Sequence, residues 1–143
     1  MKRFAFERRV PFSARQMFDL VADLASYPSF VPNCSHMRVI DAPDGEKFAR
    51  MRVALGPISR AYTSRVRLDR QAGAIAASAH DGPFSRLDSL WSFTPEGQGC
   101  RVAFDISFEI ANPLLAAVAE PAFARKQEEI VEAFLREAKR RYG

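Results

Sequence analysis

Residues 100–113 read CRVAFDISFEIANP, and this stretch decides the fold. Apolar side chains occupy every second position up to residue 110, which predicts a strand over 100–111 with one buried and one solvent-exposed face. Its apolar members are Val102, Phe104, Ile106, Phe108 and Ile110. Asn112 suits a helix N-cap and Pro113 suits the first helical position, so a long C-terminal helix is expected over 113–141.

The region before this strand reads as a series of strands separated by turns. The turn signals are Asp44-Gly45, Gly56-Pro57, Gln71-Ala72-Gly73 and Glu96-Gly97-Gln98-Gly99. The strands between them are expected over 36–42, 47–55, 59–69, 74–80 and 84–94. Alternating apolar residues over 2–10 predict one further strand at the N-terminus.

A short helix is expected between the first two strands. Ser13 and Gln16 match a capping box, which favours a helix start at this point. The helix should end before Tyr27-Pro28, because proline disfavours helical backbone in the residue that precedes it. Pro32 makes the connection from Tyr27 to Cys34 stiff as well as apolar.

This order of elements predicts an α+β fold of the helix-grip type, in which a curved antiparallel sheet of seven strands wraps around the long C-terminal helix. Residues 1–143 are expected to form a single domain. A straight helix over 113–141 would be about 43 Å long, whereas a domain of this size is about 37 Å across. Pro121 lies inside that helix, so a kink or break is predicted there.

Composition indicates a soluble globular protein. Hydrophobic residues make up 48% and charged residues 27%, and no apolar run reaches the roughly 20 residues of a membrane-spanning helix. The first strand begins directly after Met1, so no targeting peptide is expected and the protein should be cytoplasmic. Two cysteines, Cys34 and Cys100, are too few for a disulfide framework.

Positive charge is concentrated over residues 46–70, which hold seven basic residues against Glu46 and Asp69. Four of the bases fall on outward positions and define a predicted basic patch: Arg50, Arg52, Arg65 and Arg67. Such a patch attracts lipid phosphates or RNA, although a solvated sheet face gives the same pattern. No aromatic residue is expected among the four bases, so only phosphate contacts are predicted.

Catalytic and metal-binding motifs are missing from the sequence. It contains no GxSxG, P-loop, GxGxxG or HExxH pattern. His36 and His80 have no nucleophile or carboxylate at a spacing that implies a catalytic constellation. Cys34 and His36 are too few ligands for a metal site. We therefore predict no catalytic residue and no metal.

Inward positions of the predicted sheet and helix carry a surplus of large apolar side chains, with twelve Phe in the chain. Two polar residues, Arg60 and Gln127, fall on these apolar stripes. Each would form a hydrogen bond either with a neighbouring protein group or with the polar head of an apolar ligand, because a buried polar group needs a partner. The residues alone leave open whether the stripes form an ordinary core or a lipid pocket.

Three blocks of the sequence resemble a known family. They are Tyr27 to Cys34 (YPSFVPNC) followed by Arg38-Val39, Gly82 to Leu87 (GPFSRL) with Trp91 and Phe93, and Phe108 to Leu115 (FEIANPLL). Together they resemble the coenzyme Q-binding family of the START superfamily, which is Bet v1-like and includes polyketide cyclase-like proteins. The resemblance extends from end to end and implies the same helix-grip fold.

The resemblance implies a bacterial, non-enzymatic protein that binds ubiquinone or a related polyprenyl lipid and supports respiration and quinone biosynthesis. Ubiquinone would be a bound ligand rather than a cofactor, and the protein would make transient contact with the inner membrane. The same family includes ribosome association toxins, so the large ribosomal subunit is an alternative partner. A polyketide cyclase-like enzyme is a second alternative.

The resemblance also assigns roles to residues. Residues 27–34 would form a flap at the pocket mouth, with Phe30, Val31 and Pro32 on the lipid tail and Tyr62 or Arg60 on a quinone oxygen. Pro121 departs from the family pattern, and residues 113–120 could then move as a lid. The full predicted binding set is Tyr27, Phe30, Val31, Pro32, Met51, Val53, Arg60, Tyr62, Val66, Leu87, Trp91, Phe104, Ile106, Phe108, Phe123, Gln127, Ile130 and Phe134.

Overall fold

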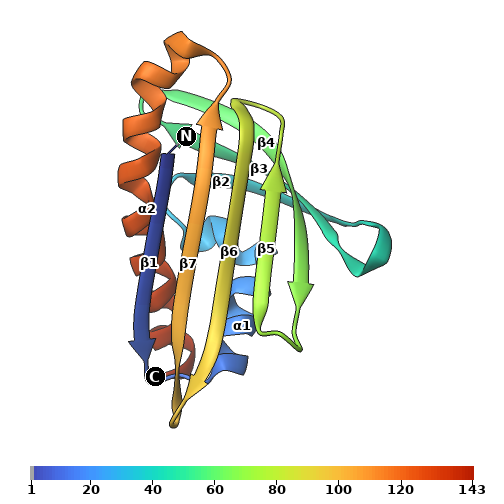
Figure 1. The fold of residues 1–143 in the computed structure, drawn as a ribbon, viewed down its shortest axis with the longest axis vertical. Coiled ribbons are helices and arrows are strands. Elements are labelled where there is room, and N and C mark those ends of the chain that lie inside the picture. The colour runs from blue at the N-terminus through green and yellow to red at the C-terminus, as the bar shows by residue number, and fades with distance from the viewer. Residues whose placement is uncertain (1) are drawn as a thin grey trace.

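The structure is a computed structural model that describes residues 2–143 (Figure 1). Seven strands form one antiparallel sheet, as predicted, and their order in the sheet is β1-β7-β6-β5-β4-β3-β2. The strands are β1 (Lys2–Val10), β2 (Cys34–Asp41), β3 (Lys47–Leu55), β4 (Ile58–Asp69), β5 (Ala74–Ala79), β6 (Phe84–Glu96) and β7 (Gly99–Ile110). The strands from β2 to β7 follow one another as neighbours, and β1 pairs with β7.

The predicted N-terminal helix is shorter than expected. Helix α1 (Ala14–Ala22) begins with the predicted capping box, in which the Ser13 hydroxyl accepts from the Gln16 N–H at 3.0 Å and the Gln16 side chain accepts from the Ser13 N–H at 3.0 Å. The helix ends at Ala22 rather than just before Tyr27. A 3-10 helix, η1 (Leu24–Ser29), follows and contains Pro28.

Helix α2 (Pro113–Tyr142) lies along the sheet and extends over the length of the molecule (Figure 1). The Asn112 side chain caps its start by accepting hydrogen bonds from the N–H groups of Leu114 and Leu115. The predicted break at Pro121 is wrong, because the helix continues through this residue. Pro121 is exposed, so the carbonyl that loses its helical donor can be hydrated instead.

The core lies between the concave face of the sheet, α2 and α1. One end is filled by Phe84, Phe108 and Phe123, whose rings pack edge to face with centroids 4.6 to 6.4 Å apart. At the other end, Phe18 of α1 packs on Phe93 with ring centroids 6.1 Å apart. The space between these two aromatic clusters is not completely filled.

Candidate functional site

A cavity of about 140 Å³ lies between the concave face of the sheet, α2 and residues 24–34. This is smaller than the few hundred Å³ typical of ligand pockets. It matches an apolar cavity of about 150 Å³ that binds one benzene molecule, so the described conformation has room for one ring. Its walls are made by Leu24, Tyr27, Val31, Pro32, Asn33, Cys34, Ala49, Met51, Val53, Ala54, Tyr62, Ser64, Val66, Ile75, Ala77, Leu87, Ser89, Trp91, Phe104, Ile106, Phe123, Lys126, Gln127, Ile130 and Phe134.

Small side chains at neighbouring positions of four strands create the floor of the cavity. Ala49 of β3 pairs with Ser64 of β4, and Ala77 of β5 pairs with Ser89 of β6. Large side chains at these four positions would fill the space under α2. The cavity is therefore encoded in the sheet by an island of Ala and Ser within a surface of larger residues.

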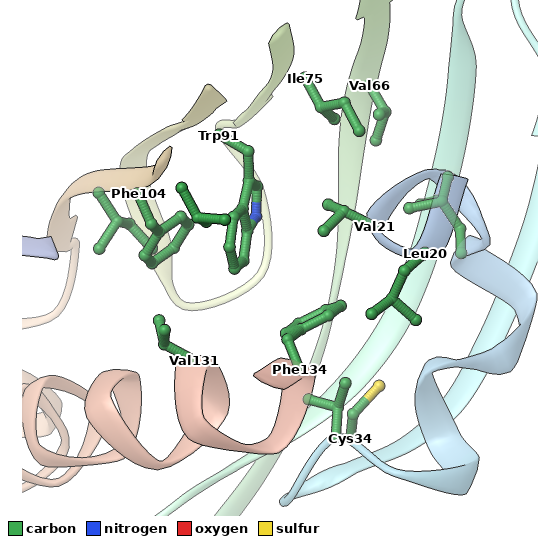
Figure 2. Close-up of a cluster of buried hydrophobic side chains, with 14 of the residues drawn as sticks. Leu20, Val21, Cys34, Val66, Ile75, Trp91, Phe104, Val131 and Phe134 are labelled. Atoms are coloured by element: carbon green, nitrogen blue, oxygen red, sulfur yellow. The ribbon is translucent and has the colours of Figure 1, made fainter. Parts of the chain in front are cut away.

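Aromatic rings form the wall nearest the C-terminal half of α2. Trp91 lies between Phe104 and Phe134, with ring centroids 4.5 and 5.1 Å away (Figure 2). Tyr27 meets Phe134 edge to face at 5.1 Å. These contacts connect the sheet, α2 and the predicted flap through one aromatic cluster, which presents π-faces and ring edges to the cavity.

Among the wall residues that are buried or half-buried, four polar side chains have an oxygen atom without a hydrogen-bond partner among the described residues. They are the hydroxyls of Tyr62, Ser64 and Ser89 and the amide oxygen of Gln127, whose amide nitrogen donates to the Phe123 carbonyl at 3.1 Å. Every fully buried side-chain oxygen or nitrogen among the described residues has a hydrogen-bond partner. These four oxygen atoms have none, so they are not fully buried and border open space. Tyr62, Ser64 and Gln127 are 7%, 3% and 2% exposed.

The two phenols and the thiol of the cavity wall are held in their neutral forms. Burial is the main cause of the raised pKa values of the Tyr27 and Tyr62 hydroxyls, and Cys34 adds to each. Burial also raises the pKa of the Cys34 thiol. Neutral phenols and a neutral thiol are poor bases and nucleophiles at pH 7. At neutral pH these three groups can therefore act as hydrogen-bond donors.

The cavity opens where Asn33, Ala54 and Lys126 lie, since these wall residues also line a shallow groove on the surface. The Ala54 N–H donates to the Asn33 carbonyl at 3.1 Å, which fixes one end of the flap to β3. Lys126 is 41% exposed and forms an ion pair with Glu129 at 3.1 Å. The mouth is therefore bordered by one amide side chain, one methyl group and one cation.

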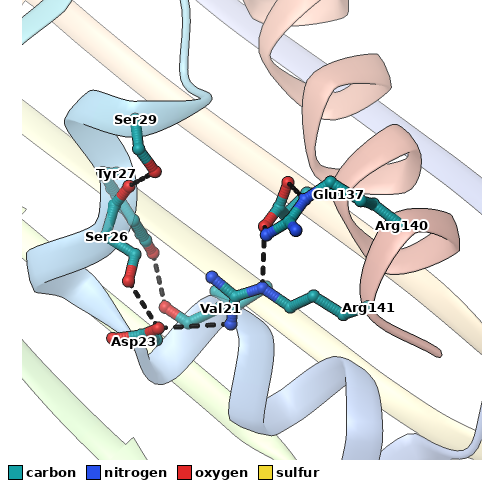
Figure 3. Close-up of polar contacts among 8 residues, drawn as sticks. All are labelled: Val21, Asp23, Ser26, Tyr27, Ser29, Glu137, Arg140 and Arg141. Atoms are coloured by element: carbon teal, nitrogen blue, oxygen red, sulfur yellow. Dashed lines mark hydrogen bonds and ion pairs between the residues drawn. The ribbon is translucent and has the colours of Figure 1, made fainter.

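Polar contacts attach the other end of the flap to α1, and the residues just before the flap to the last turns of α2 (Figure 3). The Tyr27 hydroxyl donates to the Val21 carbonyl, and Ser26 donates to the carboxylate of Asp23. Arg141 donates to the same carboxylate at 3.2 Å. The Tyr27 hydroxyl thus holds the flap to α1, and Arg141 holds the segment just before the flap to α2.

Fifteen of the eighteen residues in the predicted binding set lie in the cavity wall, and Phe30, Arg60 and Phe108 do not. Phe30 packs on the outer side of Phe134 at 5.1 Å, and Phe108 belongs to the filled aromatic cluster. The inward placement of Arg60 is wrong, because its side chain is exposed and donates to the Ser59 carbonyl. Alternation gives the side of the sheet but not where the helical cover ends. Ligand contact by the other fifteen stays a prediction.

Sequence reasoning missed the small and polar members of the wall. Ala49, Ser64, Ala77 and Ser89 were not predicted, because a binding site was sought among large apolar residues. The signal was present, since Ser64 stands between Tyr62 and Val66 and Ser89 stands between Leu87 and Trp91 at inward positions. Asn33 and Lys126 belong to the wall because elements far apart in the sequence approach each other there, and no local sequence pattern predicts this.

The predicted basic patch is exposed on the opposite face of β3 and β4. Arg65 pairs with Glu46, and Arg50 lies 4.0 Å from Asp81, while Arg52 and Arg67 have no ion pair among the described residues. The expectation that no aromatic residue lies here is wrong. The Phe48 ring is 5.7 Å from the Arg65 guanidinium carbon, so this face offers a π-surface as well as charge.

Other candidate features of the sequence stay on the surface. His36 and His80 are both exposed. Within residues 2–143, no three His, Cys, Asp or Glu side chains gather in a way that would hold a metal ion. The described helices include none with the length and apolar character to cross a membrane.

The fold and cavity define a helix-grip protein, and comparison with known proteins identifies its family. Residues 10–135 match the family described as "Polyketide cyclase / dehydrase and lipid transport", and the chain belongs to this family. The predicted family relationship is confirmed.

Individual relatives carry two kinds of name. "Ribosome association toxin RatA" of Pseudomonas aeruginosa is 36% identical over 94% of this chain and 93% of its own length. "Coenzyme Q-binding protein COQ10 homolog B, mitochondrial" of Xenopus laevis is 31% identical over 92% of this chain and 56% of its own. The solution structure of an 18 kDa protein of Caulobacter crescentus has a TM-score of 0.78 and 32% identity, and covers 100% of this chain and 99% of its own.

Proposed function

We propose that this protein binds ubiquinone or a related polyprenyl lipid without converting it, with the ring in the cavity, and acts as its carrier or chaperone in support of respiration and quinone biosynthesis. The observation that carries this proposal is the set of unpartnered polar groups in an apolar, ring-sized cavity. Three of them are hydroxyls, those of Tyr62, Ser64 and Ser89. A hydroxyl can donate a hydrogen bond, and the carbonyl oxygens of a quinone ring only accept them.

The size of the cavity determines where a polyprenyl tail would lie. A volume of about 140 Å³ matches an unsubstituted ring, so the substituted ring of ubiquinone would have to widen the cavity, and a long tail would leave through the mouth beside Asn33, Ala54 and Lys126. A carrier of this kind would be cytoplasmic and would contact the inner membrane transiently to exchange its ligand. The name of the Xenopus relative supports quinone as the ligand class.

A cyclase-like activity receives less support from the site. General acid–base catalysis needs a group whose pKa lies near the working pH. Desolvation moves the pKa values of Tyr27, Tyr62 and Cys34 upward, away from that range. These wall residues are suited to binding a ring rather than to moving its protons.

Trp91 gives a direct test, because it is the single Trp of the chain and lies in the cavity wall. A ubiquinone with a one-isoprene tail should quench its fluorescence with saturation. Ala77→Leu fills the cavity floor and should reduce this binding at least about tenfold, in line with the cost of overpacking. Ala76→Leu is the matched control, because the neighbouring residue points to the other face of β5 and should leave quenching unchanged. Equal quenching of both variants would refute the proposal.

Ribosome association is a second candidate, favoured by the name of the Pseudomonas relative and by the exposed basic patch. A protein that contacts rRNA phosphates loses affinity as salt rises. Cosedimentation with large ribosomal subunits should therefore fall with salt, and should disappear when Arg50, Arg52, Arg65 and Arg67 are changed to Gln. Retained quinone quenching by this variant would separate the two candidates. Unchanged cosedimentation would remove the basic patch from the second one.

A further inference from the structure

The first three turns of α2 are apolar on the side that faces away from the sheet. Residues 113–124 read PLLAAVAEPAFA and contain one charged residue, Glu120. Leu114 is 84% exposed and Val118 is 50% exposed. Ala117 and Pro121 are also exposed, and their spacing places all four residues on one stripe. A helix on a protein surface normally carries polar residues on this side, and an apolar stripe of this kind marks an interaction site.

A second apolar element lies beside the stripe. Gly56 and Pro57 form the exposed turn between β3 and β4. A Cβ atom on Gly56 would lie 3.7 Å from the Cβ of Ala122, so the turn approaches α2 directly next to Pro121. We call Pro57 and the four stripe residues the apolar end. In Figure 1, the start of α2 lies at one extreme of the molecule, with the β3–β4 turn near it.

The apolar end adjoins the mouth of the cavity. Asn33, Ala54 and Lys126 line both the cavity and a shallow groove that continues to Gly56 and Ala122. A tail that left the mouth along this groove would arrive at the apolar end. The two features therefore form one continuous path from the cavity to the exposed stripe.

Positive charge surrounds this path. Arg52 and Arg60 lie within four residues of the β3–β4 turn, and Arg125 follows Pro121 by one turn of α2. All three are exposed, and none forms an ion pair with another described residue. Lys126 is neutralised by Glu129, which leaves Glu120 against three arginines. An apolar surface with a cationic border fits an anionic lipid bilayer, where apolar side chains insert and bases meet phosphates.

We propose that the apolar end docks on an anionic lipid bilayer, with Leu114, Val118 and Pro57 inserted among the headgroups and the cavity mouth facing the lipid. Docking itself needs no ligand in the cavity. Its use as a loading position rests on the proposed lipid-binding function, because the tail could then stay in the bilayer while the ring enters the protein.

Cosedimentation with vesicles tests this docking surface. The full chain should sediment with phosphatidylcholine vesicles that contain phosphatidylglycerol, and the double variant Leu114→Gln/Val118→Gln should lower the partition coefficient at least about tenfold. Ile40→Gln/Leu90→Gln is the matched control, because these residues are 52% and 43% exposed but lie on the sheet. It should bind as the unchanged protein does. Circular dichroism checks that each variant is folded.

A charge variant identifies the lipid class. Arg60→Gln/Arg125→Gln should weaken binding to the phosphatidylglycerol vesicles about tenfold and change binding to pure phosphatidylcholine little. Equal sedimentation of the Leu114/Val118 variant and the unchanged protein would overturn the proposal. So would absence of vesicle binding by the unchanged protein, or loss of self-association instead of vesicle binding in the variant. Trp91 quenching by the short-tail quinone, measured without vesicles, shows separately whether the proposed function stands.

Discussion

Arg141, in the last turn of α2, donates a hydrogen bond from Nη1 to Oδ2 of Asp23 at 3.2 Å, across 118 positions of the chain. Asp23 is the residue between α1 and η1, four residues before the flap begins at Tyr27. The same guanidinium donates from Nε to Glu137 at 2.8 Å, and Arg140 donates to Glu137 at 2.6 Å (Figure 3). Arg141 thus links the end of α2 to Asp23 just before the flap, while Glu137 receives both Arg140 and Arg141 and holds the Arg141 side chain in place.

Glu137 should make the protein lose stability in acid. Hydrogen bonds from Arg140 and Arg141 lower its pKa from 4.5 to about 2 in the folded protein. Its stabilising effect is therefore present above the unfolded pKa and is lost as the pH falls from about 4.5 through about 2. Glu137→Gln should cost roughly 1 to 3 kcal/mol at pH 7, as expected for hydrogen bonds to charged groups. Thermal unfolding at pH 7 and pH 2.5 measures both effects.

Glu128→Gln provides the control, because Glu128 lies on the exposed side of the same helix and has no ion pair among the described residues. The difference between unchanged protein and Glu137→Gln should shrink at pH 2.5, whereas the control should match the unchanged protein at pH 7. A difference that stays constant between the two pH values would show that Glu137 stabilises by packing rather than by charge.

Two tyrosines of the cavity wall should respond differently to loss of the hydroxyl. The Tyr62 hydroxyl has no partner among the described residues, whereas the Tyr27 hydroxyl donates to the Val21 carbonyl. Tyr62→Phe should weaken binding of the short-tail quinone about 2- to 12-fold, which corresponds to one hydrogen bond of 0.5–1.5 kcal/mol, and leave stability unchanged. Tyr27→Phe should instead lower stability and leave quinone binding unchanged. Trp91 quenching and urea denaturation give the two readings.

The outcome that contradicts this assignment is specific. If Tyr62→Phe binds the quinone as tightly as the unchanged protein but is less stable, the Tyr62 hydroxyl serves the fold. The ring of Tyr62 packs on Phe84 at 5.0 Å, and this contact is kept in the variant, so a loss of packing cannot imitate either result.

The strands were predictable because their signal is local. In β7 every second side chain is apolar, and this alternation alone is enough to predict a strand with one buried face. The helix start at Ser13 and the cap at Asn112 depend on residues within three positions. The order from β2 to β7 agrees with the short connections, since neighbours joined by two to five residues pair as hairpins, whereas the pairing of β1 with β7 has no such local signal.

The cavity was less predictable because it depends on the packing of distant elements. Its wall brings together Tyr27, Trp91 and Phe134, and no local pattern gives their separation. Arg60 shows the same limit. Alternation with Tyr62 predicts that Arg60 points to the inner side of β4, but the elements that cover the sheet end before this position, so its side chain is exposed. The cavity is small because large inward side chains also fill space, as Phe108 does.

Gly82 should be required in the turn that precedes β6. Its φ is +61°, and a Cβ atom there would lie 2.3 Å from the carbonyl oxygen of Ala61. Gly82→Ala should therefore cost clearly more than the roughly 1 to 2 kcal/mol of a left-handed alanine alone. Gly45→Ala isolates that smaller cost, because Gly45 has a φ of +75° and open space around it. Equal unfolding free energies of the two variants would contradict the predicted clash, which lies next to Tyr62.

Pro121 should make the start of α2 open more easily than the rest. The helix is continuous, but Pro121 removes one backbone donor from its interior, and Leu114, Ala117 and Val118 have little cover. Phe123, Val131, Phe134 and Ala138 are buried further along. Amide exchange followed by mass spectrometry should therefore be faster over 113–120 than over 123–138, and bound quinone should reduce the difference if the first turns act as a lid.

Pro121→Ala tests whether the first turns of α2 open because of the proline or because these turns are exposed. Alanine restores the helical donor and is favoured over proline in a helix interior by about 3 kcal/mol, so exchange over 113–120 should slow while 123–138 changes little. Ala124→Ser, one turn further on, is a control that keeps every backbone donor. If exchange over 113–120 is already as slow as over 123–138 in the unchanged protein, with or without quinone, then Pro121 has no role in opening and the first turns of α2 are a fixed part of the grip.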